Sequence, residues 1–323
     1  MRVYHNLPVP PLDTPSNLSI GNFDGVHLGH QALLRAMAVD AHQRGQQAGL
    51  LTFDPHPATV LRPHSPQPYL TTIAERLAVL QDVGLDFIVV YPFTLETART
   101  PAPTFIARLK DALRLGALWV GPDFALGRNR EGDVDALRTL GETTGFTVHT
   151  IDPQTIGGDE VRSGRIRQHL QEGQVEIAAQ LLGRPYLING IVVDGAHRGR
   201  TIGFPTANLS VPPGRLLPAN GVYATWVTLD DGPSIRLPGV TNVGVRPSFD
   251  NGHRTVETHL LDFSGDLYGC PMTLEFVAHL RPEMRFPGVD ALREQIGRDV
   301  DAARRILSGG RRVESEEWRA MEE

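Results

Sequence analysis

The chain has 323 residues, of which 41% are hydrophobic and 21% charged, and its net charge at pH 7 is −6. These values are ordinary for a globular protein of about two domains, and the acidic balance argues against a nucleic-acid partner. The single cysteine, Cys270, excludes an internal disulfide and fits a reducing compartment. No stretch approaches the ~20 apolar residues of a membrane span, and the N-terminal segment lacks a signal-peptide core. We therefore expect a cytoplasmic protein with no membrane partner.

The first half of the sequence alternates strand and helix patterns. Apolar runs next to glycine predict strands, and apolar residues at helical spacing predict helices between them. The predicted strands are 18–21, 49–53, 85–91, 117–120 and 146–151, and the predicted helices are 30–44, 72–84, 102–115 and 134–140. Strands separated in this way favour right-handed crossovers and a mostly parallel, Rossmann-like α/β sheet. Such a sheet binds its ligand beyond the carboxyl ends of its strands.

The pattern changes near residue 185. Short strand-like runs punctuated by Gly and Pro then follow one another without a long helix, which favours a small antiparallel β-barrel. The predicted helices are 164–171, 174–182 and a closing amphipathic helix at 289–307, and the predicted strands are 186–193, 221–229, 235–243, 255–261 and 272–280. We place the domain boundary so that the two domains are 1–183 and 184–323.

The segment GNFDGVHLGH at 21–30 lies between the first predicted strand and the first helix. Gly25 and Gly29 let the backbone approach a bulky anion, and the helix N-terminus offers free N–H groups and partial positive charge. His27 and His30 can point into the same phosphate site across this turn. Two surface histidines are one alternative. A zinc site is another, although no third ligand follows at suitable spacing.

This segment resembles the first signature of the nucleotidyltransferases with an HxGH-type motif, whose histidines stabilise a triphosphate while an acceptor phosphate attacks the α-phosphorus. Together with TFDPHP at 52–57, it is similar to the adenylyltransferase half of prokaryotic FAD synthetase. GPDFALG at 121–127 and GD at 132–133 resemble the next block of that family. The resemblance implies ATP contacts at Gly21, Phe23, Asp24, His27 and His30, and flavin contacts at Asp54 and Asp123.

The second phosphate-side signature of this superfamily is similar to SGRIR at 163–167, at the start of a predicted helix. The resemblance implies ATP contacts there, since Ser163 can cap the helix and meet a phosphate and Arg167 adds positive charge. The family usually carries a pair of small hydroxyl residues here. Arg162 replaces the first of them, and Gly164 stands at a position often held by Ser or Thr. An ordinary capped helix is the alternative interpretation.

The second half carries an independent string, GAHRGRTIGFPTANL at 195–209, which resembles the riboflavin kinase domain. The resemblance implies that Thr206 and Asn208 hold Mg²⁺ and the nucleotide phosphates. A hydroxyl and an amide oxygen are hard, neutral ligands that suit Mg²⁺. Gly199 and Gly203 permit the close backbone approach that a bound nucleotide needs.

TVETHLLDF at 255–263 resembles the strand that bears the catalytic glutamate of the riboflavin kinases. The glutamate maps to Glu257, which would deprotonate the attacking hydroxyl. Alternation places Glu257, His259 and Leu261 on one face of the strand. Without the resemblance, a lone strand glutamate would be read as a solvated side chain. Segments 239–249 and 280–283 also look like the kinase pattern.

The two resemblances together cover about residues 15–307 and imply a bifunctional transferase. It would phosphorylate riboflavin to FMN with ATP and Mg²⁺, then adenylylate FMN to FAD with a second ATP, releasing pyrophosphate. Its partners would be the small molecules riboflavin, FMN and ATP. Three alternatives stay open: a related enzyme with another acceptor, such as nicotinate mononucleotide or phosphopantetheine; a flavin-binding protein without catalysis; and a kinase with an inactive adenylyltransferase half, for which Arg162 is the one point of support.

Overall fold

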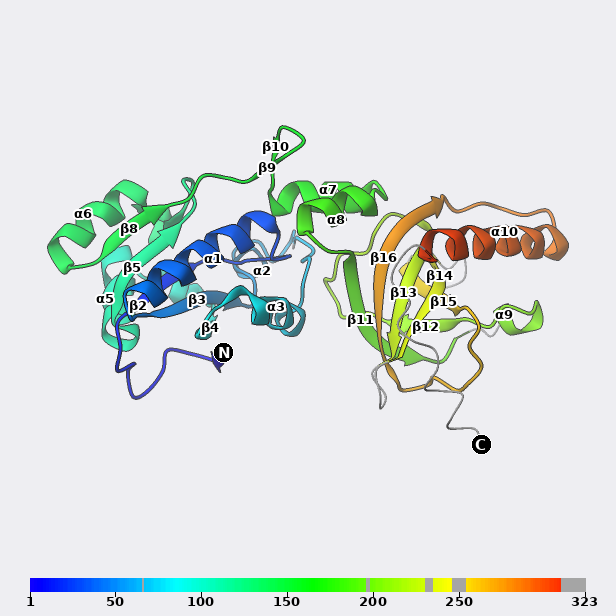
Figure 1. Cartoon of the computed structure of the whole chain (residues 1–323), viewed down its shortest axis with the longest axis horizontal. Helices are drawn as coiled ribbons and strands as arrows, with labels where there is room; N and C mark the ends of the chain where they lie inside the picture. The colour runs from blue at the N-terminus through cyan, green and yellow to red at the C-terminus, as the bar shows by residue number, and fades with distance from the viewer. Residues whose placement is uncertain (66, 196–197, 230–234, 246–253, 309–323) are drawn as a thin grey trace. The chain divides into compact units, whose positions relative to one another are not determined.

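The structure is a computed structural model that describes residues 1–65, 67–195, 198–229, 235–245 and 254–308. The chain divides into two compact units, Met1–Ser163 and Gly164–Glu323 (Figure 1). Residues 196–197 of the glycine-rich string and 246–249 of the kinase-like segment lie outside the described residues.

The first unit is built on a six-stranded sheet in which every neighbouring pair is parallel. The strand order β1-β4-β3-β2-β5-β8 reverses its direction at β2, which lies between β3 and β5. This confirms the expected Rossmann-like domain and places a ligand-binding crevice beyond the ends of β2 and β5. The strands are β1 (Arg2–Tyr4), β2 (Ser16–Ile20), β3 (Gln47–Asp54), β4 (Phe87–Pro92), β5 (Leu115–Val120) and β8 (Thr147–Thr150).

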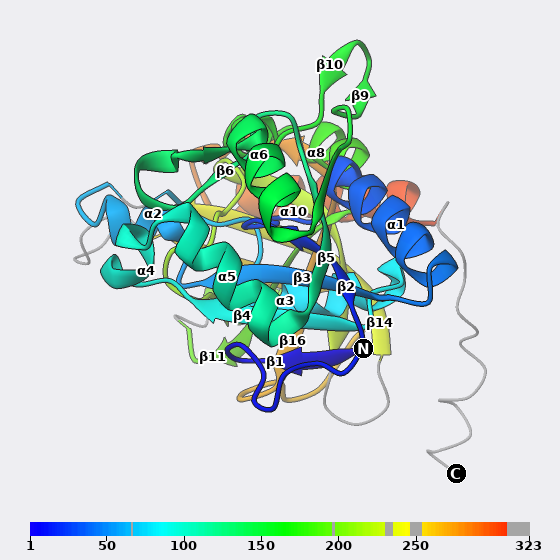
Figure 2. The same ribbon diagram turned by 90° about the vertical axis from the view of Figure 1, so that its left-hand side faces the viewer.

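Helices cover both faces of this sheet, as Figure 2 shows for α1 (Leu28–Gln43) and α5 (Ala102–Leu113). Because successive strand residues point to opposite faces, Leu50 packs in the core on the α1 side and Leu51 in the core on the α5 side. Both leucines are fully buried. The remaining short elements of this unit are α2 (Pro57–Leu61), α3 (Ile73–Val79), η1 (Leu80–Val83), α4 (Leu95–Arg99), β6 (Ala125–Leu126), η2 (Arg128–Arg130), β7 (Gly132–Asp133), α6 (Val134–Thr144), β9 (Thr155–Ile156) and β10 (Asp159–Glu160).

Local signals set most of the helix ends. The predicted capping box is present at α3, where Thr72 accepts from the backbone of Glu75 and the Glu75 carboxylate accepts from the backbone of Thr72. The predicted helix 102–115 is too long, because Arg114 adopts a left-handed conformation with φ 49° that ends α5. Leu115 already belongs to β5.

The second unit contains α7 (Ser163–Gln171, whose first residue closes the first unit), α8 (Val175–Leu182) and a closed six-stranded barrel of order β11-β12-β15-β14-β13-β16. Every neighbouring pair in the barrel is antiparallel, which confirms the expected architecture. The strands are β11 (Tyr186–Val193), β12 (Ala207–Ser210), β13 (Gly221–Leu229), β14 (Ile235–Val245), β15 (Arg254–Leu260) and β16 (Pro271–Arg281), and a short helix, α9 (Arg198–Thr201), precedes β12. The sequence had predicted five of these strands and missed β12, which has only four residues.

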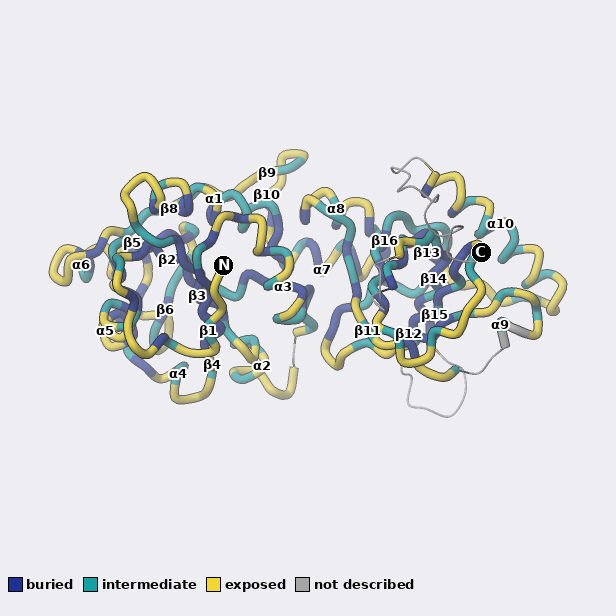
Figure 3. The backbone as a smooth tube through the Cα atoms, turned by 60° about the horizontal axis from the view of Figure 1, so that its bottom comes forward, coloured by how far each residue is buried: buried dark blue, intermediate teal, exposed yellow. Residues whose placement is uncertain are grey.

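The interior of the barrel and its outer wall are packed differently. Inside, Thr225, Thr241 and Thr258 are fully buried and form a hydroxyl chain with Oγ1–Oγ1 distances of 2.8 and 2.9 Å. Outside, α10 (Val289–Leu307) packs Ala303 against the wall. In Figure 3 most of β13 is buried, whereas β11 alternates between buried and more exposed residues and most of α10 is intermediate or exposed. Among the helices in the described ranges, none has the length and apolar character to cross a membrane.

Candidate functional site

His27 and His30 lie at the N-terminus of α1, where their rings stack with centroids 3.6 Å apart. His27 is the N-cap residue, and its Nδ1 accepts from the backbone N–H of His30 at 3.2 Å. The ring Nδ1 of His30 is buried and has no hydrogen-bond partner in the described structure. Burial, together with the nearby His27 and Arg76, holds the pKa of His30 well below its ordinary value. His30 is therefore neutral at pH 7.

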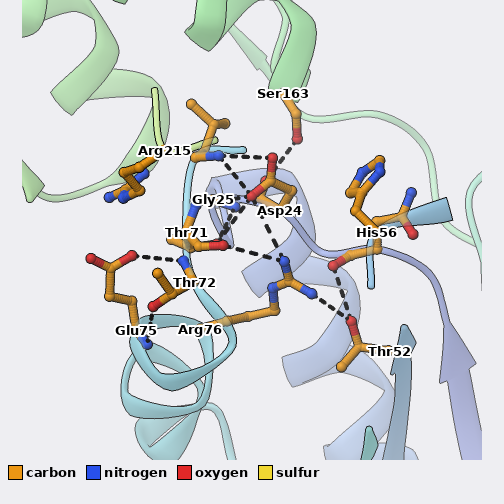
Figure 4. A network of polar contacts seen from close by, with 12 residues as sticks. Asp24, Gly25, Thr52, His56, Thr71, Thr72, Glu75, Arg76, Ser163 and Arg215 are labelled. Carbon is orange, nitrogen blue, oxygen red and sulfur yellow. Dashed lines mark hydrogen bonds and ion pairs between the residues drawn. The ribbon is translucent and has the colours of Figure 1, made fainter. Parts of the chain in front are cut away.

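The loop that presents the two histidines is held by a buried polar network (Figure 4). The carboxylate of Asp24 accepts from the backbone N–H groups of Leu70 and Thr71 at 2.9 Å, and the Thr71 hydroxyl accepts from Gly25 at 3.0 Å. Nη2 of Arg76 lies 3.8 Å from the Asp24 carboxylate. These contacts fix the loop, whose non-glycine residues include two with positive φ, Phe23 (48°) and Val26 (42°).

The Asp24 side chain is buried in this network, and its expected role as an ATP contact stays a prediction. Its side chain is only 2% exposed and points into the network with Thr71 and Arg76. It is not among the described residues that line the cavity beside His30. Arg76 and Thr71 were not predicted at all, because the contacts that make them important join segments more than forty residues apart.

A cavity of about 360 Å³ opens beyond the carboxyl ends of β2 and β5. The structure brings five of the predicted ATP-site residues to its wall, together with Asp123 and Arg162: Gly21, Phe23, His27, His30 and Ser163. The Ser163 hydroxyl donates to the backbone oxygen of Asp24 at 2.8 Å, which ties the second signature to the loop of the first (Figure 4). Arg167 lies on α7 within the second unit, where it is buried, and is not one of the described residues that line this cavity.

A larger cavity of about 810 Å³ adjoins the first and shares five lining residues with it: Ile20, Gly21, Asn22, Asp123 and Phe124. Its wall is rich in aromatic rings, contributed by Phe53, Phe93, Phe105 and Phe124. A volume of this size and an apolar wall with a few polar groups are typical of sites for flat cofactor-sized ligands. Of the two predicted flavin residues, Asp123 lines both cavities. Asp54 lies exposed at the end of β3, and its carboxylate raises the pKa of the buried Arg76, against the larger lowering by burial.

The second unit has a cavity of about 420 Å³ on the outer wall of the barrel, beside α10. Glu257 and Thr206 both line it, and so does His259, which confirms the predicted face of β15. In the sheet register Glu257 stands between Asn208 of β12 and Asn242 of β14, so the three side chains form a row across one face. Gly203, with φ +85°, lies in the loop between the lining residues Ile202 and Phe204.

The glycines of the preceding loop leave room for the predicted ligand atoms. A Cβ at Gly195 would lie 2.1 Å from Nδ2 of Asn208, and one at Gly199 would lie 2.2 Å from the Phe204 carbonyl oxygen and 3.3 Å from Oγ1 of Thr206. The hydroxyl of Thr206 and the amide of Asn208, near the carboxylate of Glu257, form a set of oxygen ligands that fits Mg²⁺. This ion usually takes few ligands from the protein and others from the substrate phosphates. Within the described ranges, no group of three or more His, Cys, Asp or Glu side chains is arranged to hold a metal ion.

A buried ion pair that the sequence did not predict completes the wall of this cavity. Nη2 of Arg281, at the end of β16, donates to the Asp299 carboxylate of α10 at 2.8 Å, and Nε donates to the same group at 3.0 Å. The Asp299 residue is 4% exposed. An acidic residue on the apolar face of an amphipathic helix was the one available signal. The pair fixes α10 beside the row that contains Glu257.

The α/β unit has paired histidines at a helix N-terminus, and the barrel has a glutamate beside a glycine-rich loop. Together they define a two-domain transferase that handles nucleotide phosphates. Residues 10–165 match the family model of FAD synthetase, and residues 182–307 match that of riboflavin kinase. The chain is 38% identical over 309 residues to the bifunctional riboflavin kinase/FMN adenylyltransferase of Escherichia coli K12, covering 95% of this chain and 97% of the relative. It is 35% identical to the protein of the same description from Listeria monocytogenes, over 90% of this chain and 92% of the relative. A crystal structure from Streptococcus pneumoniae, described as a macrolide-efflux protein, superimposes with a TM-score of 0.85 at 29% identity over 94% of this chain and 98% of that chain.

The chain therefore belongs to the family of bifunctional riboflavin kinases/FMN adenylyltransferases, which are ATP-using transferases. Both of its domains are present, in the order that the two sequence resemblances predicted.

Proposed function

We propose that the barrel phosphorylates riboflavin to FMN and that the α/β unit adenylylates FMN to FAD, with ATP and Mg²⁺ used in both steps. One observation carries the proposal: the histidine-lined cavity and the phenylalanine-lined cavity adjoin along Gly21, Asn22 and Asp123. Flavin bound among the aromatic rings would place its phosphate beside the α-phosphate of ATP bound at the histidines. The aromatic wall also favours a flavin over the acceptors of related nucleotidyltransferases.

Adenylylation at this junction would be achieved by alignment and electrostatics. The FMN phosphate is already an anion at neutral pH, so it attacks the α-phosphorus without a general base, and pyrophosphate leaves. Gly21, Phe23, His27, His30 and Ser163 would contact ATP. A triphosphate brought against the stacked rings would raise the pKa of His30 and so strengthen the hydrogen bond of its imidazole to phosphate. We propose that Asp24 and Arg76 position this loop, and the predicted ATP contact at Asp24 stays a prediction.

In the barrel, Glu257 would accept the proton of the terminal ribityl hydroxyl as that oxygen attacks the γ-phosphorus of ATP. Mg²⁺, held by Thr206 and Asn208, would supply charge neutralisation at the phosphates. We also propose that Arg167 and Gly203 contact ATP and that Asp54 contacts the flavin. The single cysteine, which is not in a disulfide, supports a reducing cytoplasmic location.

One incubation tests the function. Protein, riboflavin, ATP and Mg²⁺ are combined, and riboflavin, FMN and FAD are separated by chromatography over time. We expect FMN to form first and FAD to follow. A chain that stops at FMN would contradict the adenylyltransferase half, and a chain that consumes no riboflavin would contradict the kinase half.

A further inference from the structure

Arg162 is the residue of the second signature that neither the sequence nor the proposed mechanism explains. It stands where the family usually has a small hydroxyl residue, and it lines the cavity that contains His27 and His30. Its Nη2 lies 3.2 Å from Oδ2 of Asp123, and the guanidinium also pairs with Glu160 of β10. The Arg162 side chain is 56% exposed, so its charged end remains accessible from the cavity.

The charges around this cavity make Arg162 stand out. Among the described residues that line the cavity, it is the only arginine or lysine, whereas Asp123 and Asp152 are acidic. His30 is neutral at pH 7 because burial and its neighbours hold its pKa well below the ordinary value. A triphosphate entering here would otherwise meet two carboxylates and no permanent cation.

The position of Asp123 sharpens the problem. Asp123 lines both the nucleotide cavity and the adjoining aromatic cavity, at the junction where the two phosphates must meet. A carboxylate at that point repels both the attacking and the attacked group. The Arg162 guanidinium is placed on this carboxylate, so it already reaches the junction.

We propose that Arg162 is a phosphate-binding residue of the adenylylation site, where its guanidinium moves from the carboxylates of Asp123 and Glu160 to the phosphate oxygens of ATP. Carboxylate and phosphate present similar pairs of oxygens to the planar fork of donors, so one partner can replace the other. This inference rests on the proposed FMN adenylyltransferase activity. In this interpretation, Arg162 supplies a phosphate contact at a position where the family usually has a small hydroxyl residue. Arg162 then no longer supports a chain in which only the kinase half is active.

The experiment compares Arg162→Ala and Arg162→Lys with Arg138→Ala in the full chain. Arg138 is a comparably exposed arginine of α6, 48% exposed, that pairs with Asp135 and is not among the described residues lining the nucleotide cavity. With supplied FMN, we expect Arg162→Ala to raise the KM for ATP and the inhibition constant of pyrophosphate by roughly 10- to 100-fold, the effect of losing charge-assisted hydrogen bonds. Arg162→Lys should recover part of this loss, because it keeps the charge without the fork. Arg138→Ala should leave both constants unchanged.

Two further measurements separate the ways in which the inference could fail. Riboflavin phosphorylation and the melting temperature should be unchanged in Arg162→Ala, so a general loss of fold would be visible. If the parent chain makes FAD and Arg162→Ala keeps its KM for ATP, the phosphate contact is wrong; if the parent chain makes no FAD, the proposed function fails instead. Restoration of the parent KM in the double variant Arg162→Ala, Asp123→Asn would also overturn the contact, because Arg162 would then act only by neutralising Asp123.

Discussion

The backbone N–H of His30 donates to Nδ1 of His27 across 3.2 Å, while the rings of the same two residues stack 3.6 Å apart. Protonating both rings would bring two like charges together at the end of α1 that already carries partial positive charge. An anion in the adjoining cavity relieves that repulsion. In the proposed reaction, a phosphate in this cavity would favour the protonated form of His30.

Replacement of His30 by Ala should therefore reduce FAD synthesis while FMN still forms and accumulates. Loss of one preorganised donor at a site of growing negative charge costs roughly 10²–10³ in rate. His42→Ala on the same helix is the matched control, because His42 is about half exposed and pairs with Asp86. Product chromatography measures the effect. Stoichiometric zinc in the parent chain, lost together with stability in the variant, would support the metal site instead.

Acidification should destabilise the first unit through His30. Its pKa in the folded chain lies well below 6.5, the ordinary value expected of the unfolded chain, so the unfolded state binds the proton first. The contribution of neutral His30 to the free energy of unfolding is fully present above pH 6.5. It is lost as the pH drops toward the lowered pKa of His30 in the folded chain, by at most about 1.4 kcal/mol per pH unit for one group. Urea unfolding between pH 7.5 and pH 5 (roughly the range in which histidine titrates) should show a shallower decline in His30→Asn. Parallel curves for parent and variant would contradict this role.

Glu257→Gln should abolish most FMN formation and leave the conversion of supplied FMN to FAD near normal. The amide keeps the shape of the side chain and loses the base, which costs roughly 10²–10⁴ in rate. Glu275→Gln is the matched control, since Glu275 is a glutamate of the same barrel that pairs with Arg236. It is not among the described residues that line the cavity. Phosphorylation of riboflavin by Glu257→Gln at the parent rate would remove Glu257 from the mechanism.

Asp299→Ala should destabilise the second unit by about 3 kcal/mol, because it leaves the Arg281 guanidinium without its carboxylate in a largely buried position. Glu294→Ala on the same helix removes an exposed pair with Arg298 and should cost less than about 1 kcal/mol. Denaturant unfolding compares the two. We also expect a higher KM for riboflavin in Asp299→Ala, since the ion pair forms part of the cavity wall. Equal stability of the two variants would show that the ion pair is not needed to hold α10.

A fragment 184–323 should fold and make FMN but not FAD, as the predicted boundary implies. A longer fragment, 164–323, should be more stable, because α7 and α8 contribute contacts within the second unit. The backbone N–H of Ala219 donates to the oxygen of Leu170 at 2.8 Å, and that of His279 donates to Glu176 at 2.9 Å. Melting temperatures and product assays of the two fragments decide between the boundaries. An unfolded short fragment with a folded long one would move the boundary to residue 163.

The sequence by itself determined most of the elements, because these depend on residues close together in the chain, and equally local motifs carried the family resemblances that implied the two chemistries. The segment 21–30 contains the turn glycines, both histidines and the helix start, and alternation alone placed Glu257 and His259 on one face of a strand. The Thr72 capping box is equally local. Such patterns keep their meaning whatever the rest of the chain does.

Only the tertiary structure decided how these residues are supported and which of them meet. Burial of Asp24 against Leu70 and Thr71, the bond between Ser163 and the loop, and the Arg281–Asp299 pair all join segments well separated in the sequence. The four-residue strand β12 exists because β11 and β15 offer it hydrogen bonds on both sides. Long-range contacts of this kind depend on the packing of whole elements, and packing places the Asp24 carboxylate in the loop network and Arg162 on the wall of the cavity beside His30.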